Sequence, residues 1–258
     1  MPADSIDRII ELPEDPLGGT AGAKLFHVLF AGKTSNEKLP YIVFNEKVAG
    51  EIGRMIGLCC PEVLIEPFED RWYFFSRWQE TTRQGTVLPP GSASELAAFF
   101  QRNPEYVHGM IVFDLYVGNN DRRRDNIVLR NDGRLALIDH GNALLSYRSS
   151  DSRVPSGIER LESLESDICA MFDKPHHFLG ALTDTALVAS WVEKIRQIPD
   201  FFIKSLIQNH PEMEYINPEL KEKTISFLMD RRSYLWDHIM KHRELFPNLA
   251  EEGLNDVS

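Results

Sequence analysis

The sequence predicts an α+β fold in two lobes, a small strand-rich N-lobe and a mostly helical C-lobe. Short apolar runs separated by turn residues fill the chain before residue 78, whereas helical periodicity dominates after residue 92. Between them, residues 79–91 form a polar stretch with paired prolines, which is typical of a boundary. We therefore assign residues 1–16 to an N-terminal arm, residues 17–85 to the N-lobe and residues 86–258 to the C-lobe.

The N-lobe opens with a glycine-rich stretch and an apolar run. Residues 17–24 carry three glycines, and residues 25–31 predict a strand that ends just before Lys33. Backbone N–H groups can approach a phosphate where side chains are absent, so the glycine-rich stretch predicts either a phosphate-covering loop or a flexible turn. Residues 41–44 predict a second short strand or the lead-in to a helix.

The rest of the N-lobe predicts one helix and one hairpin. Residues 45–57 place apolar side chains on one helical face, with Asn45 suited to cap the start and Gly57 the end. Residues 61–67 and 71–78 are apolar and aromatic runs on either side of an acidic turn, so we expect them to form two paired strands.

Helices dominate the predicted C-lobe. Asn103 followed by Pro104 is a strong signal for the start of a helix. The helix expected over residues 105–117 is strongly apolar, so we expect it to be central and buried. Asn217 followed by proline repeats that signal near the end of the chain. The remaining helices are expected at residues 95–100, 158–172, 185–208 and 218–242.

Composition and charge exclude several classes of protein. The net charge is −11, and because nucleic acids and anionic membranes both select positive charge, we expect neither as a partner. No apolar run approaches membrane-spanning length, and the N-terminus lacks a secretory signal. Three cysteines, two of them adjacent, form no disulfide framework, which predicts a cytoplasmic protein. Residues 122–124 form a local basic cluster.

Residues 117–143 carry the side chains on which the functional prediction depends. Asp121 and Asn126 lie in one loop, and a short apolar run at residues 127–129 follows. An Asn-Asp-Gly turn, which tolerates positive φ, then precedes a return strand that delivers Asp139. An antiparallel hairpin therefore brings Asp121, Asn126 and Asp139 to one end.

These three side chains suit phosphoryl transfer with ATP and Mg²⁺ as cofactors. An aspartate such as Asp121 can accept or orient the proton of an attacking hydroxyl. Amide and carboxylate oxygens, here from Asn126 and Asp139, are hard ligands of the kind that Mg²⁺ prefers. We therefore predict Asp121, Asn126 and Asp139 as catalytic residues, and the last two also as metal ligands.

The motifs resemble those of the HipA-like kinase family within the protein-kinase-like superfamily. The matching segments are G-N-N-D-R-x-x-x-N at residues 118–126 and L-I-D-H-G at residues 137–141. The resemblance covers roughly residues 17–145. It implies a two-lobed protein-kinase-like fold with ATP·Mg²⁺ bound between the lobes.

The resemblance also implies a lysine and a glutamate that bind the nucleotide from the N-lobe. A lysine on a strand before the helix would hold the phosphates of ATP. Lys33 fits this role best, and Lys24 and Lys38 are alternatives. A glutamate of the helix would orient the lysine, with Glu46 as the first candidate and Glu51 as the second.

Further expectations concern the hinge and the basic cluster. Phe75, Ser76 and Arg77 would supply backbone groups and an apolar wall for adenine. Arg122 would steady either phosphate charge or the acidic loop around it, and Arg124 would face solvent.

The sequence leaves more than one prediction open for the phosphate acceptor and for the activity. The acceptor is predicted to be a protein Ser or Thr hydroxyl, with a small molecule or the protein's own serines, near residues 146–152, as alternatives. The cores of the predicted strands contain no lysine, which favours a kinase-shaped nucleotide-binding module without turnover as the second hypothesis. The D-R-x-x-x-N pattern also resembles phosphoinositide-type lipid kinases, against which the acidic balance counts. Oligomeric state is not predicted.

Overall fold

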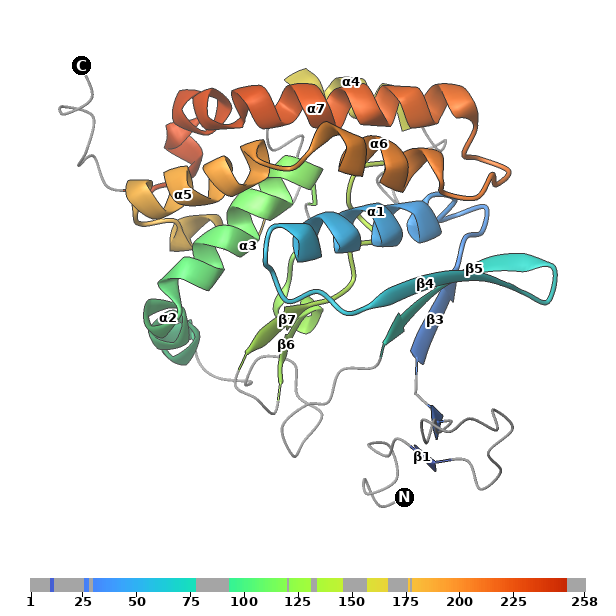
Figure 1. Cartoon of the computed structure of the whole chain (residues 1–258). Coiled ribbons are helices and arrows are strands. Elements are labelled where there is room, and N and C mark those ends of the chain that lie inside the picture. The colour runs from blue at the N-terminus through green and yellow to red at the C-terminus, as the bar shows by residue number, and fades with distance from the viewer. Residues whose placement is uncertain are drawn as a thin grey trace, which may run out of the picture.

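The computed structural model describes residues 10–11, 26–27, 30–77, 93–119, 121–130, 134–145, 157–166, 176 and 178–249. Within them, a small sheet gathers at the N-terminal end and helices fill most of the rest, as Figure 1 shows. This arrangement confirms the predicted α+β class. The glycine-rich stretch, the boundary at residues 79–91, the Asn-Asp-Gly turn and the serine-rich segment lie outside the described residues.

A three-stranded antiparallel sheet of order β3-β5-β4 forms the N-lobe. Its strands are β3 (Phe30–Thr34), β4 (Val63–Phe68) and β5 (Arg71–Arg77). Strand β4 turns into β5 at Glu69 and Asp70, as the acidic turn predicts. The strand predicted over residues 25–31 overlaps two strands, β2 and the start of β3, and β3 continues to Thr34, so Lys33 lies inside it. A separate ribbon pairs β1 (Ile10–Glu11) with β2 (Phe26–His27).

Helix α1 (Ile42–Met55) joins this sheet to the C-lobe. Val43 packs against Val63 and Phe74 of the sheet, whereas Phe44 belongs to the main core. The helix therefore buries two faces, one in each lobe.

Helix α1 begins earlier than predicted. Of the two alternatives for residues 41–44, the lead-in to the helix is correct: Tyr41 is the N-cap, and the helix begins at Ile42. Asn45 therefore lies inside the helix rather than at its cap. Asn45 is fully buried, and its side chain binds the C-lobe backbone at Gly141 and Leu145. A tertiary contact has thus replaced the local capping role that the sequence suggested.

The central helix is α3 (Pro104–Val117), which follows α2 (Ala93–Arg102). Every residue of α3 from position 107 to 117 is buried, as its strongly apolar sequence predicts. Pro104 occupies the first turn as expected, but the Asn103 side chain donates to the Phe99 carbonyl oxygen and makes no cap hydrogen bond.

Gly118 ends α3 in a conformation that other residues rarely adopt. Its φ is 63°, and a Cβ there would lie 2.7 Å from a Leu164 methyl group. Glycine is therefore required on both conformational and steric grounds. The chain leaves the central helix here and enters the loop that carries Asp121.

Four further helices complete the described C-lobe: α4 (Gly157–Ser166), α5 (Thr185–Arg196), α6 (Asp200–Gln208) and α7 (Pro218–Lys241). The single helix predicted over residues 185–208 is two helices, because Pro199 has no N–H and disfavours a helical residue before it. The start of α7 is as predicted, with Asn217 accepting from the Leu220 N–H at 2.9 Å.

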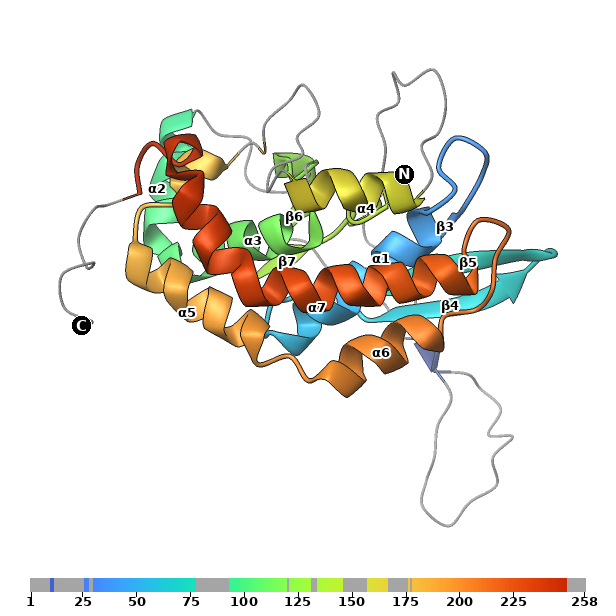
Figure 2. The same ribbon diagram turned by 90° about the horizontal axis from the view of Figure 1, so that it is seen from above.

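Helices α4 to α7 cover α1 and α3 on the side away from the strands, as Figure 1 shows. Figure 2 shows α7 running beside α5 and α6. The buried Arg231 of α7 donates to the carbonyl oxygens of Leu115 in α3, at 2.8 Å, and of Leu164 in α4. The covering layer is thus bonded to the central helix as well as packed on it. None of the described helices has the length and hydropathy needed to cross a membrane.

Candidate active site

A hairpin places Asn126 and Asp139 at one end. Strands β6 (Ile127–Leu129) and β7 (Leu135–Leu137) pair in antiparallel fashion. Beyond the last pair, the Ile138 N–H donates to the Asn126 carbonyl oxygen at 3.1 Å. Local strand pairing therefore brings the two residues to the same end, as the sequence predicts.

The buried Arg122 side chain binds the backbone at the same end of the hairpin. One terminal nitrogen donates to the carbonyl oxygens of Asn126 and Ile138, both at 2.8 Å. The other two guanidinium nitrogens bind the Asp114 carboxylate of α3 at 2.9 and 3.1 Å. The Arg122 side chain is 0% exposed, so it reaches no phosphate and belongs to no surface cluster. Of the two alternatives for Arg122, the contact with the acidic loop is therefore correct and the contact with phosphate is wrong.

Asp114 is the centre of a buried network. Besides Arg122, its carboxylate contacts His176 Nε2 at 3.0 Å and Asn119 Nδ2 at 2.8 Å. Burial alone would raise the pKa of Asp114, but the charge of Arg122 and the bonds from His176 and Arg122 hold that pKa well below its usual range.

Sequence reasoning missed this network, although one signal was present. Asp114 is the only acid between residues 106 and 117 of an otherwise strongly apolar segment. A carboxylate on a buried helix must find a cation or several donors. Asp114 therefore predicts a buried basic partner, but the sequence does not say which one.

Lys33 links the N-lobe sheet to both α1 and the hairpin. Its Nζ lies 2.5 Å from Glu46 Oε1 and 2.8 Å from Asp139 Oδ1. Burial would lower the pKa of this ammonium, but the two carboxylates outweigh burial and raise the pKa. Lys33 is therefore charged at neutral pH and holds two acids that come from different parts of the chain.

Two of the alternatives, Lys38 and Glu51, make contacts elsewhere. Glu51 pairs with Lys47 on α1 at 2.9 Å. Lys38 lies in the turn between β3 and α1, where its backbone N–H binds Asn36. Lys24 lies outside the described residues.

Glu46 is held from two sides. Its Oε1 faces Lys33, and its Oε2 accepts from the His140 N–H at 2.9 Å. Burial raises the pKa of Glu46, but hydrogen bonding with His140 and the charge of Lys33 outweigh it and lower the pKa to about 2. Glu46 is therefore ionised, and it connects α1 to the loop after β7.

Asp139 has a left-handed backbone, with φ of 59°. Aspartate tolerates this region better than most residues, and strained positions of this kind cluster at functional sites. The chain thereby turns so that the Asp139 carboxylate meets Lys33 while the next N–H, that of His140, meets Glu46. The Asp139 side chain keeps 38% of its surface exposed, which leaves it accessible to a ligand.

Asp121 lies in the loop between α3 and β6. Its Oδ2 accepts from Asn142 Nδ2 at 3.0 Å, and its Oδ1 lies 3.1 Å from Arg123 Nε. Its backbone carbonyl accepts from Asn126 Nδ2 at 2.7 Å. Because that nitrogen is engaged, the amide oxygen of Asn126 is the atom available to a cation. Asn142 connects Asp121 to the loop that also carries Asp139.

Phe75 and Arg77 lie on the opposite face of the sheet from Lys33. In the β3–β5 register Gly32 pairs with Phe75, and a Cβ on Gly32 would lie 3.1 Å from the Phe75 ring. Lys33 is one residue further along, so its side chain points to the other face. This corrects the expectation that Phe75 forms a wall beside the Lys33 site. Ala31 and Ser76, which pair with each other, share the Lys33 face instead.

The cluster offers few protein ligands for a metal ion. No group of three His, Cys, Asp or Glu side chains able to hold a metal occurs among the described residues. Asn126 and Asp139 supply one amide oxygen and one carboxylate. Such a pair suits a hard cation that takes its remaining ligands from water and phosphate.

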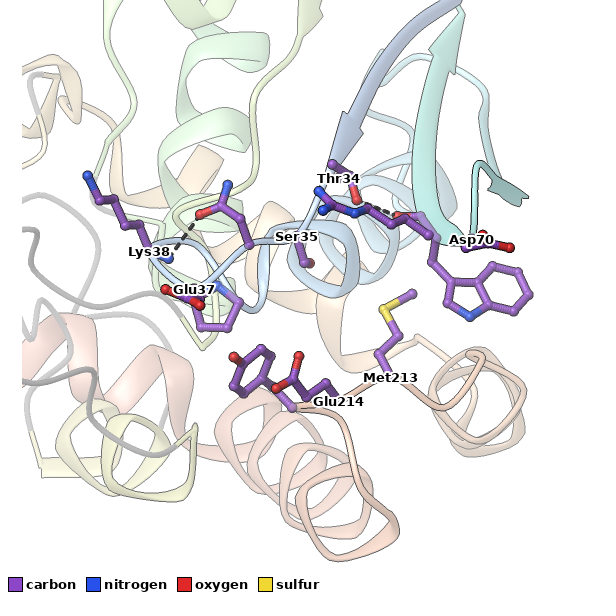
Figure 3. A pocket seen from close by; sticks show the side chains of 12 residues that line it. Thr34, Ser35, Glu37, Lys38, Asp70, Met213 and Glu214 are labelled. Atoms are coloured by element: carbon purple, nitrogen blue, oxygen red, sulfur yellow. Dashed lines mark hydrogen bonds between the residues drawn. The ribbon is translucent and has the colours of Figure 1, made fainter.

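A separate hollow of about 610 Å³ opens beyond the end of β3, and Figure 3 shows its lining. Glu37 comes from the turn after β3, Asp70 from the β4–β5 turn, and Met213 and Glu214 from the segment between α6 and α7. Neither Lys33 nor the predicted catalytic residues line it. The hollow and the charged cluster are therefore distinct features.

The fold is similar to those of known kinases, although comparison by sequence finds no match. No protein-family model and no curated protein matches the sequence. The proinflammatory kinase CtkA of Helicobacter pylori is similar in structure, with a TM-score of 0.58, 19% identity, and coverage of 90% of this chain and 95% of CtkA. HipA, from the toxin–antitoxin complex of Shewanella oneidensis MR-1 with HipB and operator DNA, gives a TM-score of 0.51 and 11% identity.

The alignment with HipA covers 86% of this chain but only 63% of HipA, so the chain spans less than two thirds of that protein. At these identities the similarities establish the fold. They agree with the arrangement of β3, α1 and the hairpin, and with the resemblance carried by the motifs. The chain has the two-lobed, kinase-like fold of CtkA and HipA.

Proposed function

We propose that this protein is an ATP- and Mg²⁺-dependent phosphotransferase whose acceptor is an alcohol group, as on a protein Ser or Thr. One observation carries the proposal. Lys33 joins Glu46 and Asp139, so a strand, a helix and the end of the β6–β7 hairpin meet at a single ammonium. A scaffold function would not need a charged lysine held at the open side of the cluster.

The N-lobe side chains suit the nucleotide. The Lys33 ammonium would contact the α- and β-phosphates, and Glu46 would keep it in place. Ala31 is exposed and small, and it shares the Lys33 face with Ser76. These two residues would border the base, in the place first expected for Phe75.

Asn126 and Asp139 would hold Mg²⁺. The fit rests on the chemistry of the donors, because both are hard oxygen ligands and the Asn126 nitrogen is already engaged. A bound Mg²⁺ would neutralise phosphate charge during transfer. Asp139 would then exchange its contact with Lys33 for the metal, while Glu46 retains the lysine.

Asp121 would receive the acceptor. The hydroxyl oxygen attacks the γ-phosphorus, the bond from that phosphorus to the β–γ bridging oxygen breaks, and ADP leaves. The hydroxyl proton passes to Asp121. Positioning and charge neutralisation supply most of the rate in such reactions, so the hydrogen bonds that fix this loop matter directly.

A second candidate is a nucleotide-binding module without turnover. It is favoured by the state of Asp121, whose two carboxylate oxygens already face Arg123 and Asn142. Two measurements together separate the candidates: the melting temperature with and without ATP·Mg²⁺, and the assay of phosphate transfer. A ligand that binds the folded state stabilises it, so nucleotide binding should raise the melting temperature. A raised melting temperature without phosphate transfer supports the module.

The test of the phosphotransferase is incorporation of label from γ-labelled ATP into the protein itself and into generic acceptor proteins. We expect transfer by the wild type and its loss in Asp121→Asn and Asp139→Asn. Glu51→Gln is the matched control, because Glu51 is a paired carboxylate of α1 outside the cluster. Equal incorporation by all four proteins would remove the assignment. Adding phosphoinositide vesicles to the assay tests the lipid-kinase alternative.

A further inference from the structure

Both carboxylate oxygens of Asp121 are occupied. Oδ2 accepts from Asn142 Nδ2 at 3.0 Å, and Oδ1 lies 3.1 Å from Arg123 Nε. A second Arg123 nitrogen, NH2, approaches Oδ2 at 3.4 Å. An acceptor hydroxyl must donate to one of these oxygens if Asp121 is to take its proton. One of the two partners therefore has to move before transfer.

Asn142 is the less mobile partner. The residue before it, Gly141, is buried and accepts from the Asn45 amide at 2.9 Å. Two residues after it, the Leu144 N–H donates to the Val117 carbonyl oxygen at 2.7 Å. The backbone around Asn142 is therefore fixed on both sides by buried hydrogen bonds.

Arg123 is the partner that can leave. Its side chain is 47% exposed, whereas the neighbouring Arg122 is 0% exposed and bound to Asp114. A solvent-exposed ion pair contributes about 0–1 kcal/mol, so exchanging it for another anion costs little. Arg123 can thus release Asp121 wherever a second anion offers it an equivalent contact.

We propose that Arg123 forms an anion site beside Asp121 that selects polypeptide acceptors with an acidic side chain next to the hydroxyl. The acidic group of the acceptor takes the Arg123 guanidinium and thereby frees Asp121 Oδ1 for the hydroxyl. The net charge of −11 would otherwise repel such an acceptor, and a local cation offsets that repulsion. This inference rests on the proposed function and adds the acceptor class to it.

The test compares two synthetic heptapeptides that carry one serine between two aspartates or between two asparagines. A third peptide, with the serine between two lysines, is used with the Arg123→Glu variant. Their affinities for the protein with ADP bound are measured by fluorescence anisotropy, and transfer from labelled ATP is measured in parallel. We expect the wild type to favour the aspartate peptide by about fivefold. In Arg123→Ala this ratio should fall to about one, and added salt should reduce it in the wild type.

Arg196→Ala is the matched control, because Arg196 is also an exposed arginine, 41% exposed, beside a local carboxylate, Glu193. It should keep the wild-type ratio. Arg123→Glu should reverse the preference toward a lysine-flanked peptide. Affinity ratios that are equal in the wild type and Arg123→Ala, or no measurable binding of any of the peptides, would overturn the inference.

The two measurements separate the inference from the function on which it rests. A binding preference that depends on Arg123, without phosphate transfer to any peptide, would contradict the proposed function and retain the anion site. Transfer that Arg123→Ala reduces equally for both peptides would assign Arg123 to the nucleotide phosphates and overturn the acceptor site.

Discussion

Two ion-pair networks hold the hairpin, and they differ in their access to solvent. Arg122, Asp114 and His176 lie beneath it with side-chain exposures of 0%, 0% and 1%. Lys33 and Asp139 lie beside it with exposures of 34% and 38%, and in this second network only Glu46 is buried, at 2%. Each network joins helix to loop, but only the second is open to solvent.

The difference in exposure suggests different roles for the two networks, one that fixes the backbone and one that can exchange its partners. A fully buried ion pair cannot exchange its partners without leaving a charge uncompensated, so Arg122 fixes the backbone at Asn126 and Ile138 permanently. A half-exposed pair can exchange one partner for a metal or a phosphate at small cost. The buried network therefore keeps the loop in shape, while the open network can exchange its partners.

The largest effect is expected from breaking the buried network. Arg122→Met leaves Asp114 without its arginine partner and removes one donor from each of two carbonyl oxygens, so the free energy of unfolding should fall by about 3–5 kcal/mol. Urea unfolding at pH 7 measures it. Arg123→Met, one residue away and exposed, is the control and should change stability by less than about 1 kcal/mol. Equal losses in both variants would refute the distinction between the networks.

Breaking the open network should affect activity more than stability. Asp139→Asn removes the carboxylate that we propose as a metal ligand but leaves Lys33 paired with Glu46, so the free energy of unfolding should change by less than about 1 kcal/mol. Phosphate transfer should fall at least about hundredfold, because metal neutralisation of phosphate supplies several kcal/mol. Steady-state kinetics and urea unfolding of the same preparation test this. A large loss of stability would show that Asp139 holds the fold.

Glu46, the buried member of the open network, should make the stability of the protein depend on pH. Its pKa is about 2 in the folded protein against an ordinary value of 4.5. A lowered folded pKa contributes stability above pH 4.5, and that stability is lost as the pH falls toward 2. The shift corresponds to a ceiling of about 3 kcal/mol.

The stability difference between the wild type and Glu46→Gln isolates this contribution. It should be largest near pH 7 and shrink as the pH falls from 4.5 toward 2. Urea unfolding at pH 7 and pH 3 measures the difference. If it is the same at both values, hydrogen bonding with His140 and the charge of Lys33 do not set the pKa of Glu46.

Local spacing predicted the parts of the site that neighbouring residues build. The hairpin places Asn126 and Asp139 through strand pairing alone, and the Asn217 cap of α7 forms from adjacent residues. The general α+β class followed in the same way from periodicity and turn signals. These features need no knowledge of contacts between distant segments.

Contacts between distant segments account for the errors. Lys33 meets Asp139 across 106 positions of sequence, so the sequence could rank Lys33 first but left Lys24 and Lys38 open as alternatives. Phe75 was misplaced because which face it occupies depends on its register with β3. Arg122 was expected near either phosphate or the acidic loop, because a triple arginine gives no sign that one member points inward. In each case the position of the side chain depends on a partner that the local sequence does not identify.

The smallest effect concerns a neutral link between the lobes. Asn45 of α1 donates to the Gly141 carbonyl oxygen at 2.9 Å and accepts from the Leu145 N–H at 3.2 Å, with no exposed surface. Asn45→Ala leaves both buried backbone groups without this partner, and it should lower the free energy of unfolding by about 2 kcal/mol.

Hydrogen exchange at the Leu145 amide gives the local measurement for Asn45→Ala, because that amide should lose protection while the β6–β7 amides keep theirs. Asn36→Ala is the matched control: Asn36 accepts from the Lys38 and Leu39 N–H groups in an exposed turn, where water replaces it. It should cost less than about 1 kcal/mol. Unchanged protection at Leu145 in Asn45→Ala would mean that charged pairs alone connect α1 to the loop after β7, and the neutral bridge would then have no part in holding the site.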